Sequence, residues 1–363
     1  MTKEPFVPPK LPPRINCSRL VKKIGKARGA IGELNGLLVN TPNRDLISAP
    51  LINKEAVLSS RIEGTQATLE DVLMYEAQGT TSEKNEKEKD IREIINYRTA
   101  LRVGMDKLKK ESFNETTIRK LHHVLLNSVR GADKARGHLR RKQVYVLSRG
   151  LSIENATYVP PPPEKVPSLL DNWTNYINSE VEQDPLVQIG IAHYQFEAIH
   201  PFMDGNGRIG RLLIPLSLYK KKLLSYPLLY VSEFFEKNRE SYYALLSGVS
   251  TNGEWEKWLD YFLSALLVQA AKTQETVLKM VLLYEKLRAS VRKLNSVYAF
   301  GLLDVIFANP ILSATLVIKL LGASRQTVYN LLEKFTKEKI LIKMPNGKRN
   351  RVYVFRELLK IVQ

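Results

Sequence analysis

Residues 200–211 read His-Pro-Phe-Met-Asp-Gly-Asn-Gly-Arg-Ile-Gly-Arg, and together these side chains suit phosphate chemistry. The imidazole of His200 could act as a general base near neutral pH. The carboxylate of Asp204 is the kind of ligand that Mg²⁺ shares with phosphate oxygens. Arg208 and Arg211 could neutralise phosphate charge, while the glycines let a ligand approach the backbone. The segment therefore indicates an anion site beside a base.

The flanking sequence predicts how this segment is positioned. Asp184 and Pro185 are typical of a helix start, and Pro201 cannot continue a helix that ends at His200. A second apolar run, 212–219, predicts a helix that begins just after the glycines. The resulting order is a helix, a glycine-rich loop and a helix N-terminus, so several backbone N–H groups would point at one bound phosphate.

Two common glycine motifs do not explain the segment. Gly205, Gly207 and Gly210 have the spacing of a dinucleotide fingerprint, but that motif follows a β-strand and the preceding segment here is predicted to be helical. The segment also lacks the Gly-Lys-Ser/Thr ending of a P-loop. The whole string instead resembles the signature of the Fic family, His-Pro-Phe-x-Asp-Gly-Asn-Gly-Arg-x-x-Arg, at every specified position.

The resemblance implies a mainly α fold, a Fic helical core with a small β-hairpin flap, and an enzyme that moves AMP from ATP to a Ser, Thr or Tyr hydroxyl of target proteins. His200 would be the catalytic base and Asp204 would hold Mg²⁺. The same site could also remove AMP, because Fic-like proteins can activate water. The residues implied to contact the nucleotide are Glu63, His200, Gly205, Asn206, Gly207, Arg208, Ile209, Gly210, Arg211, Asn238 and Tyr243.

Two of these contacts belong to a later segment, 232–246, which is predicted to be one helix. In the family this helix lines the base pocket, so Asn238 and Tyr243 are the candidates for adenine contact. Core packing of Tyr243 and its neighbour Tyr242 explains the same pattern equally well.

An N-terminal segment, Ser59-x-x-x-Glu63-Gly64, resembles the inhibitory segment of many Fic proteins. There the glutamate pairs with the last arginine of the signature, Arg211 here, and blocks the γ-phosphate position. A carboxylate that occupies an arginine fork removes a bidentate phosphate clamp. The residues also describe an ordinary helix end, following a helix predicted over 53–61, with Gly64 as a left-handed cap. The resemblance implies an autoinhibited enzyme.

The chain is predicted to divide into four regions. These are an N-terminal helical region with the inhibitory helix (1–110), the Fic catalytic core (111–250), a helical connector (251–294) and a winged-helix domain (295–363).

Within the core, residues 137–147 and 152–159 predict a hairpin flap, which in the family holds the target segment by strand addition. Arg140, Arg141 and Lys142 could steer acidic ligands or form a solvated face. His122 and His123 are predicted to be surface or core residues, and His193 to have a structural or orienting role.

The C-terminal region combines helix-turn-helix spacing with an Asn-Gly hairpin, so it resembles a winged-helix domain. Two sets of residues could contact DNA: Ser324, Arg325, Gln326 and Tyr329 at base edges, and Lys343, Lys348, Arg349 and Arg351 at phosphates. Docking of a protein is an equal alternative. The competing hypothesis for the whole chain is therefore a DNA-binding regulator whose Fic part senses nucleotide.

Composition narrows the possible partners. The chain has 363 residues and a formal net charge of +18, which favours polyanions such as nucleotides, nucleic acids or anionic surfaces. The single cysteine, Cys17, excludes an intramolecular disulfide and suits the cytoplasm. No apolar run approaches the roughly 20 residues of a membrane span. Self-modification and a homodimer are expected from the family resemblance.

Overall fold

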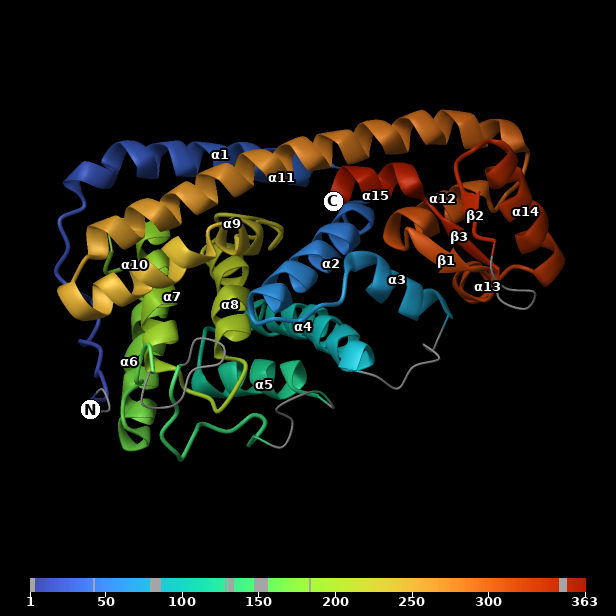
Figure 1. The fold of residues 1–363 in the computed structure, drawn as a ribbon. Helices are drawn as coiled ribbons and strands as arrows, with labels where there is room; N and C mark the ends of the chain where they lie inside the picture. Colours follow the sequence, from blue (N-terminus) through green and yellow to red (C-terminus); the bar gives the residue numbers. More distant parts are fainter. Residues whose placement is uncertain are drawn as a thin grey trace.

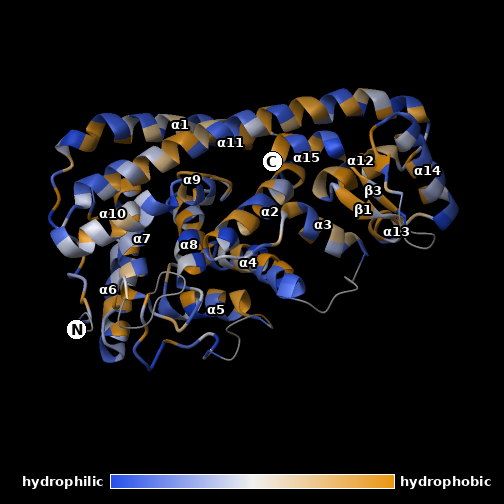
Figure 2. Ribbon diagram, viewed as in Figure 1, coloured by the Kyte–Doolittle hydropathy of each residue, from blue (hydrophilic) through white to orange (hydrophobic). Residues whose placement is uncertain are grey.

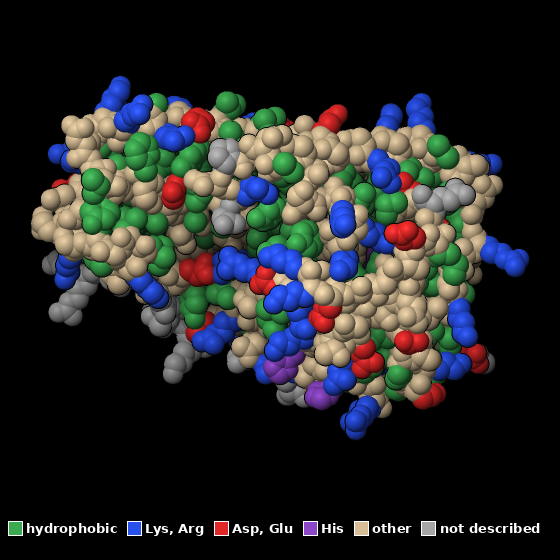
Figure 3. All heavy atoms as spheres, turned by 180° about the vertical axis from the view of Figure 1, so that it is seen from behind, with side chains coloured by type: hydrophobic (Ala, Val, Ile, Leu, Met, Phe, Trp, Pro, Cys, Tyr) green, Lys and Arg blue, Asp and Glu red, His purple; other side chains and the backbone are tan. Residues whose placement is uncertain are grey.

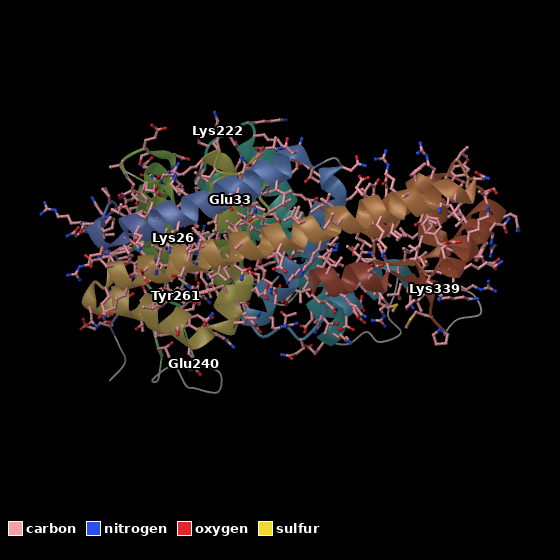
Figure 4. The ribbon with its side chains drawn as sticks, turned by 90° about the horizontal axis from the view of Figure 1, so that it is seen from above. Lys26, Glu33, Lys222, Glu240, Tyr261 and Lys339 are labelled. Atoms are coloured by element: carbon pink, nitrogen blue, oxygen red, sulfur yellow. The ribbon has the colours of Figure 1, made fainter. Side chains whose placement is uncertain are left out.

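The computed structural model describes residues 4–41, 43–78, 86–127, 129, 134–146, 156–182, 184–345 and 351–363, except the side chain of residue 45. Its architecture is mainly helical, as predicted. Two long helices, α1 (Val21–Asn40) and α11 (Trp255–Val291), lie side by side along the top of the molecule (Figures 1 and 4). Among the described residues, no helix combines the length and apolarity that a membrane crossing requires.

The body that carries residues 200–211 lies beneath this pair of helices (Figure 1). Its helices are α2 (Arg44–Ile62), α3 (Leu69–Gln78), α4 (Glu86–Leu108), α5 (Glu115–Leu125), α6 (Val166–Asn178), α7 (Pro185–Ile199), α8 (Asn206–Lys220), α9 (Ser232–Lys237) and α10 (Arg239–Asn252). Short 3-10 helices occupy Ser18–Leu20, Pro163–Lys165 and Arg292–Leu294.

A smaller C-terminal group packs against α2, α3 and α11. Its elements are α12 (Ala299–Ala308), β1 (Ile311–Ser313), α13 (Ala314–Leu321), α14 (Arg325–Lys337), β2 (Ile342–Lys343), β3 (Val352–Val354) and α15 (Arg356–Val362). The strands form an antiparallel sheet in the order β1-β3-β2, in which Val354 faces both Ile311 and Ile342. The predicted helix-turn-helix spacing is present. The Asn346-Gly347 turn, with Lys348 and Arg349, falls outside the described residues.

Several local predictions were correct because their signals are local. The Asp184 carboxylate accepts a hydrogen bond from the N–H of Leu186 at 2.7 Å, and α7 ends at His200. Thr68 and Asp71 form a reciprocal capping box at the start of α3, each side chain accepting from the other's N–H.

Three element boundaries differ from the prediction. The second helix begins at Arg44 instead of Asn53, because Ile47 and Leu51 extend its buried face by two turns. Helix α8 begins at Asn206, so Gly207 and Gly210 lie inside it and not in the preceding loop. The segment 232–246 is broken at Asn238, whose backbone angles (φ −117°, ψ 38°) are not helical.

The predicted flap is represented by a single antiparallel bridge between Val146 and Tyr158. Residues 147–155 fall outside the described residues, so the remainder of that prediction is untested.

The core is centred on α7, in which nearly every residue is buried. Figure 2 shows hydrophobic residues concentrated in elements such as α12, whereas hydrophilic residues cover much of α14. Gly190 of α7 lies against α11, and its carbonyl accepts the indole N–H of Trp258 at 2.9 Å. A Cβ at this position would lie 2.9 Å from side-chain atoms of Leu259 and Phe262, so only glycine permits this approach.

Two glycine-to-alanine substitutions should therefore have opposite effects on stability. Gly190→Ala should lower the free energy of unfolding by about 1–3 kcal/mol, because the added methyl overlaps packed side chains. Gly29→Ala, on the open face of α1, should raise it by about 0.5–1 kcal/mol, because alanine favours a helix. Urea unfolding followed by circular dichroism measures both, and equal effects would contradict the packing of α7 on α11.

Candidate functional site

His200 lies at the junction between α7 and the loop that precedes α8. It adopts the left-handed conformation (φ 50°), and its N–H donates to the Phe196 carbonyl at 3.0 Å. The Nδ1 atom lies 3.3 Å from the Glu197 carbonyl, so we assign the proton to Nδ1 and leave Nε2 as an acceptor. Burial lowers the pKa of His200 to about 4, which keeps the ring neutral at pH 7.

Arg140 holds this loop in place through backbone carbonyls. Its guanidinium donates to the carbonyls of His200 at 2.8 Å and Pro161 at 2.5 Å, and its own N–H donates to the Pro201 carbonyl at 2.9 Å. The side chain is buried, and burial lowers the pKa of Arg140 to about 10. The hypothesis that Arg140 steers ligands is therefore wrong, since its N–H groups are already engaged inside the protein; Arg141 and Lys142 remain exposed.

His122 of α5 supports the loop from below. Its ring stacks on Phe202 with the centroids 3.8 Å apart, and its Nε2 lies 3.0 Å from the Asp204 carbonyl. The N–H of Gly137 donates to Nδ1 at 2.9 Å, so Nε2 carries the proton and donates to Asp204. Burial lowers the pKa of His122 to about 4, and the neutral ring fits both contacts. The prediction that His122 is a core residue is confirmed, although its contact with the loop was not predicted.

Asp204 lies at the edge of the loop and is partly exposed. Its Oδ1 accepts the N–H of Gly205 at 2.6 Å, while its Oδ2 lies 3.3 Å from Lys134 Nζ. Arg208 approaches Oδ1 at 3.5 Å. The described residues contain no cluster of three or more His, Cys, Asp or Glu side chains able to hold a metal by themselves. One accessible carboxylate does fit a Mg²⁺ ion that takes its other ligands from phosphates and water, provided that Lys134 moves.

The N-terminus of α8 follows directly. Gly205 is its N-cap with φ 77°, and the first N–H groups of the helix point out of its end. Asn206 is buried and closes the loop, because its side chain bonds both the N–H and the carbonyl of Phe202 at 2.9 Å. Ile209 is also buried, so its side chain packs in the core and does not face the site. The helix end supplies a positive electrostatic potential for an anion.

Arg211 lies on the next turn of α8 and is 1% exposed. Its Nε donates to Ser59 Oγ at 3.0 Å and its Nη2 to the Ser59 carbonyl at 2.8 Å. The same Nη2 lies 2.6 Å from Glu63 Oε1. Gly207 allows this approach, because a Cβ there would overlap the Glu63 carboxylate. The structure therefore brings the predicted Ser59, Glu63 and Arg211 together.

Glu63 ends α2 and differs from Arg211 in exposure. Its side chain is 36% exposed, whereas the guanidinium that it contacts is enclosed. Burial raises the pKa of Glu63 and the Arg211 charge lowers it, and the lowering prevails. Gly64 follows with φ 97°, which confirms the predicted positive-φ cap. The carboxylate is thus held by charge at an accessible position.

Arg208 is also buried but has different partners. Its Nη1 lies 3.0 Å from Glu93 Oε2, and Glu93 is itself buried. The Nε of Arg208 has no hydrogen-bond partner among the described residues. The guanidinium therefore lies close to the site with part of its donor capacity unused.

The two candidates from the later segment lie in different surroundings. Asn238 lies between α9 and α10, and its amide donates to the Phe234 carbonyl at 2.8 Å. Tyr243 is 41% exposed, and the Arg239 guanidinium lies 5.7 Å from its ring centre. Burial and then the Glu63 charge raise the pKa of Tyr243, which places this ring near the contact between Glu63 and Arg211.

Tyr242 and His193 belong to the core beneath the site. The Tyr242 hydroxyl lies 2.9 Å from His193 Nε2, and His193 Nδ1 lies 3.2 Å from the Gly210 carbonyl. Burial lowers the pKa of His193 to about 3, so it is a neutral bridge between helices. This arrangement agrees with the structural role predicted for His193.

Three buried residues beside the site were not found from the sequence. Glu197 lies against Gly210, and burial raises its pKa to about 7. Glu55 accepts hydrogen bonds from Tyr97 at 3.0 Å and Ser232 at 2.6 Å. The spacing of Glu55 could have identified it, because it precedes Ser59 by four residues and so lies on the same face of the helix. No local pattern in the sequence identifies Glu197 or Tyr97.

Basic side chains also gather on the face that lies behind the view of Figure 1. Figure 3 shows Lys and Arg side chains gathered across the middle of that face, with fewer Asp and Glu side chains among them. This distribution agrees with the preference for polyanions that the net charge predicts.

Two family descriptions match the chain: the Fic/DOC family N-terminal region over residues 21–106, and the Fic/DOC family over residues 112–218. A probable protein adenylyltransferase of Aquifex aeolicus is 29% identical over 199 residues, which are 54% of this chain and 54% of that protein. The protein adenylyltransferase Fic of Drosophila mojavensis is 30% identical over 154 residues, which are 40% of this chain and 28% of that protein.

Among solved structures, a Fic family protein from Desulfovibrio desulfuricans G20 superposes with a TM-score of 0.61 at 23% identity, covering 94% of this chain and 98% of that one. The likeness concerns the fold. The chain spans about half the length of the Aquifex relative and less than a third of the Drosophila one. With both family descriptions matched along most of residues 21–218, and with the signature in place at 200–211, the chain belongs to the Fic/DOC family.

Proposed function

We propose that this protein transfers AMP from ATP to a Ser, Thr or Tyr hydroxyl of a protein. The observation that carries the proposal is the convergence of a neutral His200, the N-terminus of α8 and the buried Arg211 at one loop. The relatives from Aquifex and Drosophila, which are named protein adenylyltransferases, support the same reaction class.

The chemistry assigns one task to each group. The Nε2 of His200 accepts the proton of the attacking hydroxyl, whose oxygen forms a bond to the α-phosphorus of ATP. The bond between that phosphorus and the oxygen of the β-phosphate breaks, and pyrophosphate leaves. The first N–H groups of α8 stabilise the phosphate oxygens, and Arg208 and Arg211 offset negative charge. Asp204 is the residue that would hold Mg²⁺, which supplies further charge neutralisation when bound.

We infer that Glu63 inhibits this reaction. Its carboxylate takes the Arg211 Nη2 that a terminal phosphate would otherwise engage. Ser59 orients the guanidinium through Nε and Nη2, so Arg211 would remain aimed at the site after Glu63 moves away. Since Glu63 is partly exposed at the end of a helix, its displacement requires little unfolding. The inhibited and active states would differ mainly in the position of one carboxylate.

The remaining expectations follow the family resemblance. Target proteins, self-modification and a homodimer are proposed on that basis, as is AMP removal by water at the same site. The lone Cys17 supports a cytoplasmic location.

A second function is favoured by the surface of the C-terminal region, which we infer to be a winged-helix domain that binds DNA. Ser324, Arg325 and Gln326 are exposed at the start of α14. The guanidinium groups of Arg325 and Arg351 lie 5.7 and 5.9 Å from the ring centre of Tyr329. Two cations therefore lie beside the same residue of α14. Such a surface suits phosphate and base contacts.

The first test follows AMP transfer directly. Purified protein incubated with labelled ATP and Mg²⁺ should modify itself or added proteins. His200→Ala should lower transfer by at least about 100-fold, because a positioned general base contributes that much. Glu63→Gly should raise it by about 10-fold or more, since it frees a charged hydrogen-bond donor.

The matched control is Glu33→Gly, the same change at an exposed glutamate of α1, which should leave the rate unchanged. Mass spectrometry identifies the modified residue. The proposed activity fails if the wild type and Glu63→Gly alike leave no AMP on any protein.

The second test concerns DNA. A gel shift with the full chain should show retardation that weakens between about 50 and 200 mM salt, because cations contact phosphates. Arg325→Ala should weaken the shift, and Arg288→Ala, which removes an exposed arginine near the end of α11, serves as its control. If both variants bind DNA equally, or if the wild type binds none, this surface is excluded as a DNA-binding site.

A further inference from the structure

A second polar pocket lies between α2, the segment that leads into α9, and α11. Lys54 and Glu55 line it from α2, Tyr230 from the segment, Glu233 from α9, and Lys272 from α11. None of these residues belongs to the signature loop. The pocket is therefore separate from the proposed nucleotide site, although α2 contributes to both.

Two enclosed polar atoms in this pocket lack partners. The Tyr230 hydroxyl and Glu55 Oε2 have no hydrogen-bond partner among the described residues, while the two side chains are 8% and 2% exposed. An unsatisfied polar atom in the interior costs roughly 1–3 kcal/mol, so two of them in one pocket point to a ligand that completes their bonding.

The charged groups at the pocket indicate the sign of that ligand. Lys54 and Lys237 lie 3.2 and 2.9 Å from the Glu233 carboxylate, and Lys272 also contacts it. Each ammonium offers three N–H donors, whereas one carboxylate provides two acceptor oxygens, so donors remain in excess. Burial lowers the pKa of Lys54, the Glu233 charge raises it, and the charges of Lys272 and Lys237 lower it further. Three lysines thus share the one carboxylate of Glu233, which leaves an excess of positive charge.

The other polar groups add further donors. Tyr230 can donate its O–H, and Thr273 on α11 also lines the pocket. Burial raises the pKa of Glu55 to about 7, so at neutral pH its carboxyl carries a proton about half of the time and can donate it. Several donors around one point suit the four oxygens of a phosphate better than the two of a carboxylate.

We propose that this pocket binds a phosphate-sized oxyanion, either inorganic phosphate or the phosphate group of a monoester, through Lys54, Lys272 and Tyr230. The anion bridges α2 and α11. Ser59 and Glu63 lie one and two turns beyond Glu55 on the same helix, so the bound anion also restrains the segment that contacts Arg211. Binding of the anion can be measured without AMP transfer, so this proposal can be tested even if the proposed activity is absent.

Calorimetric titration of the full chain with inorganic phosphate tests the proposal. Binding at the pocket should fall by about tenfold or more in Lys272→Gln, which removes one charged donor. Lys279→Gln is the matched control, because Lys279 lies two turns further along α11 and pairs only with Glu275 among the described residues. It should bind phosphate within about twofold of the wild type, as expected for an exposed pair.

Tyr230→Phe is a second variant, and it should leave the fold intact. Removal of an unsatisfied hydroxyl is neutral or stabilising without a ligand, whereas it should reduce the phosphate-induced rise in melting temperature. Hydrogen exchange should also slow over residues 51–63 when phosphate is added to the wild type. Phosphate bound at the α8 N-terminus would not respond to Lys272→Gln or Tyr230→Phe, so the two sites are distinguished.

Ribose 5-phosphate separates the two sources of the oxyanion. Weaker binding of this ester than of inorganic phosphate assigns the pocket to the free ion, and equal or tighter binding assigns it to a phosphate monoester. The proposal is overturned if the wild type shows no saturable binding with a Kd below about 10 mM. It is equally overturned if Lys272→Gln, Tyr230→Phe and Lys279→Gln all bind phosphate as the wild type does.

Discussion

The charge of Arg211, enclosed almost completely by protein, is the constraint on which the site depends. A buried guanidinium must be paired and hydrogen-bonded, because an isolated charge in the interior is very costly. Ser59 and Glu63 satisfy it from α2, far away in the sequence. The requirement ties α2 to α8 and fixes the arginine in one orientation. It also explains why Gly207 has no side chain, since the carboxylate passes directly over it.

Neutral rings and backbone carbonyls keep the rest of the loop rigid. His122 and His193 each bridge two segments while burial keeps them uncharged, so they add no repulsion beside two arginines. The guanidinium of Arg140 donates to backbone carbonyls within the fold, so it does not compete with Arg208 and Arg211 for a bound anion. The loop is thus positioned by groups that contact Nδ1 and the carbonyl of His200, and not its Nε2.

The sequence was informative wherever the cause of a structure was local. The cap at Asp184, the end of α7 at His200 and the capping box at Thr68 depend on neighbours within four residues, and each was predicted correctly. The contacts of His122 and Arg140 join segments separated by about 60 to 80 positions, which no periodicity reveals. The break at Asn238 was missed for a similar reason, because packing against α11 overrides helix propensity there.

Helix α2 also joins the Fic core to the C-terminal elements, because α12 and α15 pack on it while its other end carries Glu63. With 19 residues, Pro50 among them, it is about 28 Å long, and a tilt of about 4° around its first turn would displace the far end by about 2 Å. That displacement is comparable to the 2.6 Å separation between Glu63 and Arg211. The helix therefore has the geometry of a lever, in which a small rotation at the C-terminal elements would be amplified at the carboxylate that contacts Arg211.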